Sequence, residues 1–145
     1  KLGEYYATLS HCGACHTPMT EKGPDMAKWM GGGAPMELPM MGDGKLVPPN
    51  LTMHATGLAE WTEADLVRAL KELKKKDGSP IFGPMQLFAP GWQQLSDAEI
   101  GGIWAYLKSL PPVDNKTEPS TFKPKGPPPA PEVAPDAGAA APDAK

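Results

Sequence analysis

The sequence lacks a long hydrophobic run, an excess of basic residues and any cysteine outside one short motif. Because no run reaches the roughly 18 apolar residues that a membrane-spanning helix needs, no segment is expected to cross a membrane. The formal net charge of −3 is mildly acidic, whereas nucleic-acid binding depends on clustered lysine and arginine. These absences argue against a membrane-spanning protein and against a nucleic-acid-binding one.

No segment shows the alternation of apolar and polar residues that is typical of a strand, and no internal repeat is present. Apolar residues at helical spacing instead predict three helices, over residues 2–10, 62–76 and 96–110. The last helix has the clearest boundary, since Ser96 and Glu99 have the spacing of a capping box and Pro111 stops the pattern. The sequence therefore predicts an all-α fold.

Glycine occurs at positions of these helices where it should be unfavourable. Gly101 and Gly102 lie inside the last predicted helix, where each costs on the order of 1 kcal/mol relative to alanine. Close approach of another backbone would explain them, and Gly3 in the first helix is the natural counterpart. We therefore predict that the first and last helices cross at these glycines.

Two long connections, over residues 31–56 and 78–95, are rich in glycine, proline and methionine and are predicted to be irregular. Such connections are unusual in a compact domain unless they wrap around something. Ten of the 19 prolines lie in the last 35 residues, so residues 112–145 are predicted to form an irregular Pro/Ala-rich tail or linker. That division leaves residues 1–111 as the folded domain.

The two cysteines lie in the motif Cys12-Gly13-Ala14-Cys15-His16. A C-x-x-C-H pattern is typical of covalent c-type haem attachment. Two intervening residues let one helical turn present both thiols to the vinyl groups of the porphyrin, and the adjoining His16 then provides an imidazole ligand for the iron. The sequence thus predicts one covalent haem c on Cys12, Cys15 and His16.

Three other interpretations of the motif remain to be weighed. A thioredoxin-like dithiol is expected beside a βαβ pattern, which is missing. A zinc site needs a fourth ligand, for which only His11 and His54 remain. A structural disulfide would explain neither His16 nor the long connections.

The haem iron needs a second axial ligand, and eight methionines are available. A thioether opposite histidine raises the iron potential and suits electron transfer. Met85 is the preferred candidate, because it follows Pro84 in a turn-rich segment well separated from His16. Met53, Met40 and His54 remain open as alternatives, since any one methionine can simply fill the core.

At this point the chain resembles class I c-type cytochromes, and more narrowly the single-haem domains in cytochrome subunits of bacterial dehydrogenase complexes. The resemblance covers residues 3–113 and is carried by Gly3-Glu4-Tyr5, the haem motif, Pro49-Asn50-Leu51-Thr52, Thr56-Gly57-Leu58, Trp61-Thr62-Glu63 and the ending Ala105-Tyr106-Leu107-Lys108-Ser109-Leu110-Pro111-Pro112. It implies a small class I cytochrome c fold, with three main helices and long loops around one haem. It further implies that Asn50 and Trp61 lie near the haem propionates.

These observations predict a single-electron carrier with His16 and Met85 as axial ligands, not an enzyme. A haem peroxidase, or a gas or redox sensor with a labile sixth ligand, is the alternative. We expect a periplasmic or other extracytoplasmic location, with an export signal absent from this sequence. The expected partners are redox proteins, including a larger membrane-associated complex contacted by the tail. The lysines of 71–76 form either a docking patch or a solvated helix end.

Overall fold

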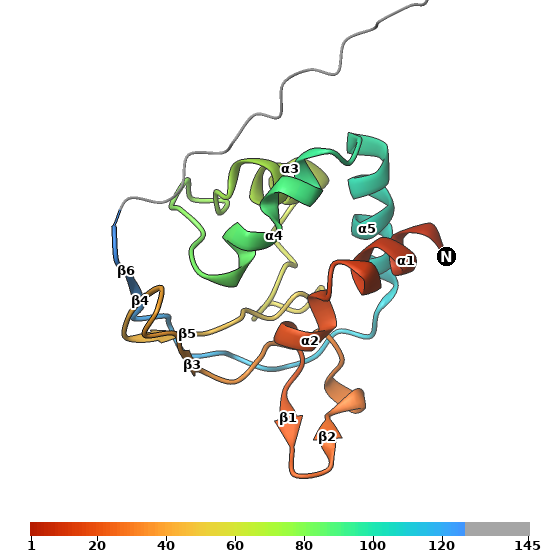
Figure 1. Cartoon of the computed structure of the whole chain (residues 1–145). Helices are drawn as coiled ribbons and strands as arrows, with labels where there is room; N and C mark the ends of the chain where they lie inside the picture. The colour runs from red at the N-terminus through yellow and green to blue at the C-terminus, as the bar shows by residue number, and fades with distance from the viewer. Residues whose placement is uncertain (127–145) are drawn as a thin grey trace, which may run out of the picture.

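The computed structural model describes residues 1–126 (Figure 1). The helices are α1 (Leu2–Leu9), α2 (Cys12–His16), the 3₁₀ turn η1 (Met26–Lys28), α3 (Glu63–Glu72), α4 (Pro84–Gln93) and α5 (Asp97–Ser109). The strands are β1 (Met19–Thr20), β2 (Gly23–Pro24), β3 (Met36–Glu37), β4 (Gly42–Asp43), β5 (Lys45–Leu46) and β6 (Lys123–Pro124). Each strand has two residues and pairs with one other, as β1–β2, β3–β5 and β4–β6. The predicted all-α class is confirmed, with four longer helices carrying the body of the domain.

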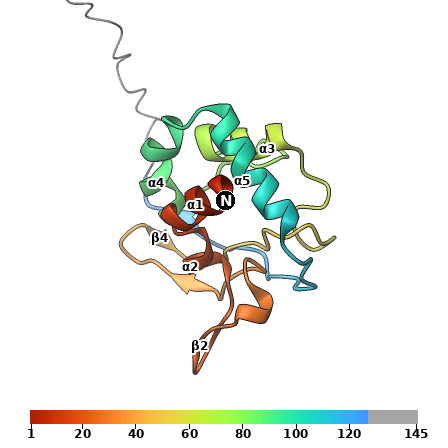
Figure 2. The ribbon, with the colours of Figure 1, turned by 90° about the vertical axis from the view of Figure 1, so that its right-hand side faces the viewer.

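Helix α1 lies across α5, as Figures 1 and 2 show. At the crossing the Cα of Gly3 packs on Gly102, and a Cβ added to Gly3 would overlap the carbonyl of Gly102. The predicted crossing of the terminal helices is therefore confirmed. Gly101 lies close to a different residue: a Cβ added there would be 2.7 Å from the carboxylate of Glu63, at the start of α3.

The core lies where α1, α3, α4 and α5 meet. Buried apolar side chains from these helices form one cluster, which includes Ala7, Leu66, Leu70, Ala89, Trp92, Ile100, Ile103, Trp104 and Leu107. In α5 these residues fall at the i, i+3, i+4, i+7 spacing of an amphipathic helix. None of the helices in residues 1–126 is long and apolar enough to cross a membrane.

Helix α4 corrects the prediction of an irregular connection over residues 78–95. Proline is favourable in the first turn of a helix, where its missing N–H has no helical acceptor to lose. Pro84 occupies that place after Gly83, whose φ of 81° suits glycine. Pro90 lies inside the helix. The prolines and glycines of this segment therefore do not prevent a helix, and the prediction of irregular structure was wrong here.

Helix α3 ends earlier than predicted. Its last helical residue is Glu72, and Leu73 turns left-handed with φ of 53°, so the lysines at 74–76 lie beyond it. Two of the lysines at 71–76 form ion pairs. The Nζ of Lys71 lies 2.7 Å from the Asp97 carboxylate, and that of Lys74 lies 3.6 Å from the Glu72 carboxylate.

The described part of the predicted tail, residues 112–126, returns over the domain. Its strand β6 pairs with β4, and the Ser120 hydroxyl accepts a 2.9 Å hydrogen bond from the Val47 amide. Lys125 donates to the carbonyl of Pro39 at 2.9 Å. These residues therefore pack on the haem-motif domain itself. The remainder of the predicted tail, 127–145, and any partner contact there lie outside the described residues.

The helix crossing makes Gly3→Ala strongly destabilising. The added methyl has no room against the α5 backbone, and overpacking of this kind costs about 1–3 kcal/mol or more. Gly91→Ala is the matched control, because Gly91 lies in α4 with nothing within 4 Å of its added Cβ, and it should be neutral or stabilise by up to about 1 kcal/mol. Thermal unfolding of the two variants measures the difference. Equal melting temperatures would show that α1 does not depend on this contact.

Candidate cofactor site

The haem-attachment motif forms a helix of its own, α2, one turn after α1. Cys12 and Cys15 are three residues apart and therefore lie on one face of this helix. Both are free, half-buried thiols, and burial raises the pKa of Cys12 to about 11. Two adjacent thiols on one face are the arrangement needed to attach one flat group at two points.

His16 ends the same helix with its imidazole held in one tautomer. Its Nδ1 lies 2.8 Å from the carbonyl oxygen of Pro49. A carbonyl only accepts, so Nδ1 carries the hydrogen and Nε2 keeps a free lone pair. Burial lowers the pKa of His16, although the bond to Pro49 opposes the shift. A neutral, oriented imidazole of this kind is the form in which histidine ligates a metal.

The segment that follows η1 lies against the C-terminal end of α2. The amide of Gly32 donates to the His16 carbonyl at 2.8 Å, and the amide of Met30 donates to the Thr17 hydroxyl at 3.1 Å. Gly33 lies so close to the Cys15 carbonyl that a Cβ would overlap it. Gly32 and Gly33 thus lie directly against the backbone of the motif helix.

Trp29 packs on the other side of the motif. Its ring lies where a Cβ of Gly13 would stand, and its indole N–H donates to the Tyr106 hydroxyl at 3.0 Å. Packing against Trp29 therefore favours glycine at position 13, a position that the C-x-x-C-H pattern leaves open.

The Pro49 carbonyl is fixed in turn by the neighbouring Asn50, whose side chain is fully buried. The Asn50 amide donates to the Val113 carbonyl at 2.8 Å and to the Thr56 hydroxyl at 3.1 Å. Its oxygen accepts from both the amide and the hydroxyl of Thr52, at 2.9 and 2.8 Å. Asn50 therefore joins the loop below His16 to the segment that follows α5.

The predicted contacts of Asn50 and Trp61 with the haem propionates stay predictions. Both amide hydrogens of Asn50 already have protein acceptors, so a propionate would compete with Val113 and Thr56. Trp61 is half-buried and packs against the hydrophobic core.

Met85 lies in the first turn of α4, half-buried against the core. Three residues further on in α4 is Phe88. The centroid of its ring lies 6.3 Å from the ring centroid of His11, the residue before the haem motif. The helix that carries Met85 thus reaches the start of α2. The assignment of Met85 as the second axial ligand stays a prediction.

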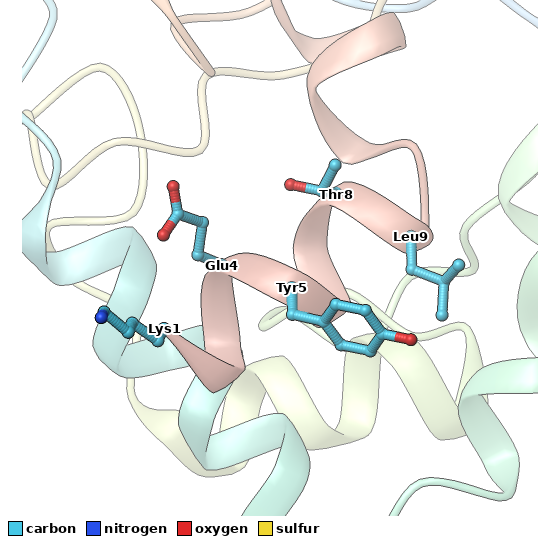
Figure 3. A pocket seen from close by; sticks show the side chains of 5 residues that line it. All are labelled: Lys1, Glu4, Tyr5, Thr8 and Leu9. Atoms are coloured by element: carbon cyan, nitrogen blue, oxygen red, sulfur yellow. The ribbon is translucent and has the colours of Figure 1, made fainter.

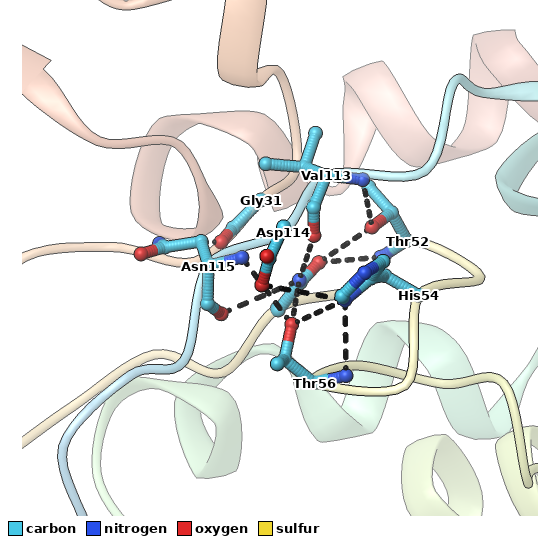
Figure 4. Close-up of polar contacts among 8 residues, drawn as sticks. Gly31, Thr52, His54, Thr56, Val113, Asp114 and Asn115 are labelled. Atoms are coloured by element: carbon cyan, nitrogen blue, oxygen red, sulfur yellow. Dashed lines mark hydrogen bonds and ion pairs between the residues drawn. The ribbon is translucent and has the colours of Figure 1, made fainter.

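The alternative ligands differ in what surrounds them. Met40 is 94% exposed, which places it on the surface, whereas Met53 packs against the core. His54 accepts a 3.2 Å hydrogen bond from the Thr56 amide at Nδ1, which also lies 3.8 Å from Asp114. Its ring is thus part of the loop network around Asn50 (Figure 4).

The other interpretations of the motif find no support in the described part of the chain. Cys12 and Cys15 are not joined in a disulfide. Among residues 1–126, no group of three histidine, cysteine, aspartate or glutamate side chains lies close enough together to hold a metal ion.

An open depression on α1, lined by Lys1, Glu4, Tyr5, Thr8 and Leu9, includes no residue of the motif (Figure 3).

Comparison with known proteins identifies the class. Residues 3–111 match the family model for cytochrome c, so the chain belongs to the cytochrome c family. Cys12, Cys15 and His16 supply the attachment motif of that family, and the chain accordingly carries covalent haem c and serves in electron transfer. The free thiols on one face of α2 and the neutral imidazole of His16 fit that cofactor.

Named relatives narrow the resemblance. The cytochrome c subunit of alcohol dehydrogenase (quinone) from Gluconacetobacter polyoxogenes is 37% identical over 131 residues, covering 84% of this chain and 26% of the relative. The fructose dehydrogenase cytochrome subunit from Gluconobacter japonicus is 32% identical over 106 residues, covering 71% and 20%. A dihaem cytochrome c from Cereibacter sphaeroides is 31% identical over 107 residues, covering 73% and 33%. The chain thus spans a fifth to a third of these relatives.

Sequence reasoning missed two parts of the site. It did not foresee Pro49 as the acceptor for His16, since residues 33 positions apart give no pattern. It also overlooked the contact of Gly32 and Gly33 with α2, although three successive glycines were a visible signal of close backbone approach.

The Asn50 network makes Thr52→Val destabilising. The Thr52 hydroxyl donates to Asn50 and accepts a 3.0 Å hydrogen bond from the buried Val113 amide. Leaving that amide without a partner should cost about 1–3 kcal/mol. Thr20→Val removes an exposed hydroxyl from the β1–β2 turn and should cost less than about 0.5 kcal/mol. Denaturant midpoints of the two variants give the comparison. A Thr52→Val midpoint as high as that of Thr20→Val would contradict the anchoring role of Thr52.

Proposed function

We propose that this domain is a single-electron carrier with His16 and Met85 as the axial ligands of its haem iron. The observation that carries the proposal is the hydrogen bond from His16 Nδ1 to Pro49, since it leaves Nε2 as the free ligand atom. When bound, the haem supplies an iron that alternates between the ferric and ferrous states. The protein holds the ring and its ligands in place.

The position of Met85 supports its role. A thioether in the first turn of a helix that begins Gly83-Pro84 is carried on a restricted backbone. Its neighbours Leu87 and Phe88 are 70% and 40% exposed, so this end of α4 presents a large apolar surface beside the ligand. Such a surface suits contact with a porphyrin face or edge.

A carrier fits these residues better than a peroxidase does. With histidine and methionine both bound, the iron has no open position for a substrate. A peroxidase would also need a distal acid–base group, for which His54 is the candidate.

We further propose an extracytoplasmic location and a place in a dehydrogenase complex. The thiols of Cys12 and Cys15 must be available for ligation to haem, which takes place outside the cytosol. The relatives named above include subunits of alcohol and fructose dehydrogenases, and they support a partner of that class. Electrons would then pass from the dehydrogenase to the haem and on to a further acceptor.

Met85→Ala tests the ligand and the role together. Loss of the thioether should abolish the charge-transfer band between methionine sulfur and ferric iron and lower the reduction potential. Visible absorption spectra of the oxidised protein and a redox titration measure both effects. Met40→Ala is the matched control, because the Met40 side chain is 94% exposed and its loss should leave the band and the potential unchanged. A band that survives Met85→Ala would assign the second ligand elsewhere.

A further inference from the structure

The imidazole of His54 is held by two groups of one residue, Thr56 (Figure 4). The backbone amide of Thr56 lies 3.2 Å from His54 Nδ1, and the Thr56 hydroxyl lies 2.9 Å from the same nitrogen. A backbone amide only donates, so Nδ1 must be an acceptor here. The ring of His54 is therefore neutral in this arrangement and carries its hydrogen on Nε2.

The direction of the Thr56 hydroxyl is fixed by its other partners. Its oxygen accepts a 3.1 Å hydrogen bond from the Asn50 side chain and a 3.3 Å hydrogen bond from the Asn115 backbone amide. A hydroxyl has two acceptor sites and one hydrogen, so that hydrogen points to His54 Nδ1. Thr56 thus joins His54 to Asn50 and to the segment beyond α5, and it does so only while Nδ1 carries no proton.

The same nitrogen has a second partner within reach. The Asp114 carboxylate lies 3.8 Å from Nδ1, and among residues 1–126 it is the one charged side chain within 4 Å of the His54 ring. The side chains of His54 and Asp114 are 31% and 82% exposed, so a proton from solvent reaches this pair. A protonated Nδ1 is a donor, which the Asp114 carboxylate can accept and the Thr56 amide cannot.

We propose that His54 is a positioning residue, which anchors the loop behind His16 when it is neutral and releases that loop when Nδ1 takes up a proton. This role rests on the proposed function, in which His16 binds the haem iron. Protonation leaves both hydrogens of Thr56 without their acceptor. The ring then pairs with Asp114, and Thr56 no longer holds Asn50 in one place. Because histidine changes its charge between about pH 5 and 8, the switch responds to a mildly acidic medium.

Release of the loop acts on the iron through the residue before Asn50. The carbonyl of Pro49 accepts the hydrogen of His16 Nδ1, and such a hydrogen bond makes the imidazole a more basic ligand. A more basic ligand stabilises ferric iron more than ferrous iron. Loosening the Pro49 bond therefore favours reduction, and the positive charge gained by His54 acts in the same direction. Both effects raise the reduction potential as the pH falls.

Amide hydrogen exchange in the reduced, haem-loaded protein tests the release directly. From about pH 8 to about pH 5, we expect the protection factors of the Thr56 and Asn115 amides to fall about tenfold, because each amide loses its hydrogen-bond acceptor. Over the same interval the ratio of reduced to oxidised protein at a fixed ambient potential should rise about threefold to tenfold. Nuclear magnetic resonance measures the exchange, and a redox titration at each pH measures the ratio.

His54→Asn separates the anchor from the switch. An asparagine side-chain oxygen accepts from the amide two residues further on, as Nδ1 of His54 does, but it takes up no proton in this pH range. The variant should therefore keep the protection of the Thr56 and Asn115 amides at low pH and show a smaller change of potential with pH.

His11→Asn is the matched control. His11 is exposed, and its φ of 56° is one that asparagine tolerates. The same substitution there should leave the loss of Thr56 and Asn115 protection at low pH unchanged. If His54→Asn fails to take up haem, the nitrogen shifts of the His54 ring in the natural protein test the same point, since Nδ1 must be the unprotonated nitrogen of the neutral ring.

Each outcome supports the switch or overturns it. Equal protection of the two amides at both pH values overturns it, and so does a loss of protection that persists in His54→Asn. A hydrogen on Nδ1 of the neutral ring also overturns it. Persistence of the methionine–iron band in Met85→Ala would overturn the proposed ligand instead, because the exchange of the Thr56 and Asn115 amides is measured apart from that band.

Discussion

The hydrogen bond from His16 Nδ1 to the Pro49 carbonyl is the contact on which the site depends. It selects the tautomer of the imidazole and ties the motif helix to a loop far along the chain. Asn50, the next residue, then ties that loop to Val113 beyond the last helix. One line of contacts therefore runs from His16, the proposed iron ligand, to the described C-terminal segment. The orientation of His16 depends on the fold around it, because His16, Asn50 and Val113 are buried.

Two backbone approaches make this line possible. Gly3 lets α1 rest directly on α5, and Gly33 lets the supporting loop rest on Cys15. Each replaces side-chain packing by contact between backbones, which leaves little freedom to shift. These backbone contacts make the domain rigid at the α1–α5 crossing and beside the motif helix. The long irregular connections are then tolerable, because their ends are held by glycine contacts and by buried hydrogen bonds.

The sequence was most informative where a local pattern carries the chemistry. The attachment motif, the capping box of α5 and the glycine crossing all depend on residues whose spacing is short or whose type is unusual. Helix α4 was missed, because Pro84 and Pro90 were taken as signs of irregular chain, although proline in the first turn is compatible with a helix. The partners of His16 and Asn50 could not be read from the sequence, since they join residues 33 and 63 positions apart. Long-range pairs of this kind follow from tertiary packing alone.

His16 and Met85, the two proposed axial ligands, are positioned by different kinds of contact. His16 is held from outside its helix, by a loop carbonyl and a buried network. Met85 is held within its own turn, by the restricted backbone of Pro84 and by the cap that Gln86 provides. A thioether is a weak acceptor and forms no strong second hydrogen bond that could orient it. Backbone restriction is therefore the means left to position Met85, and this gives the proline and the capping glutamine of α4 a reason to flank it.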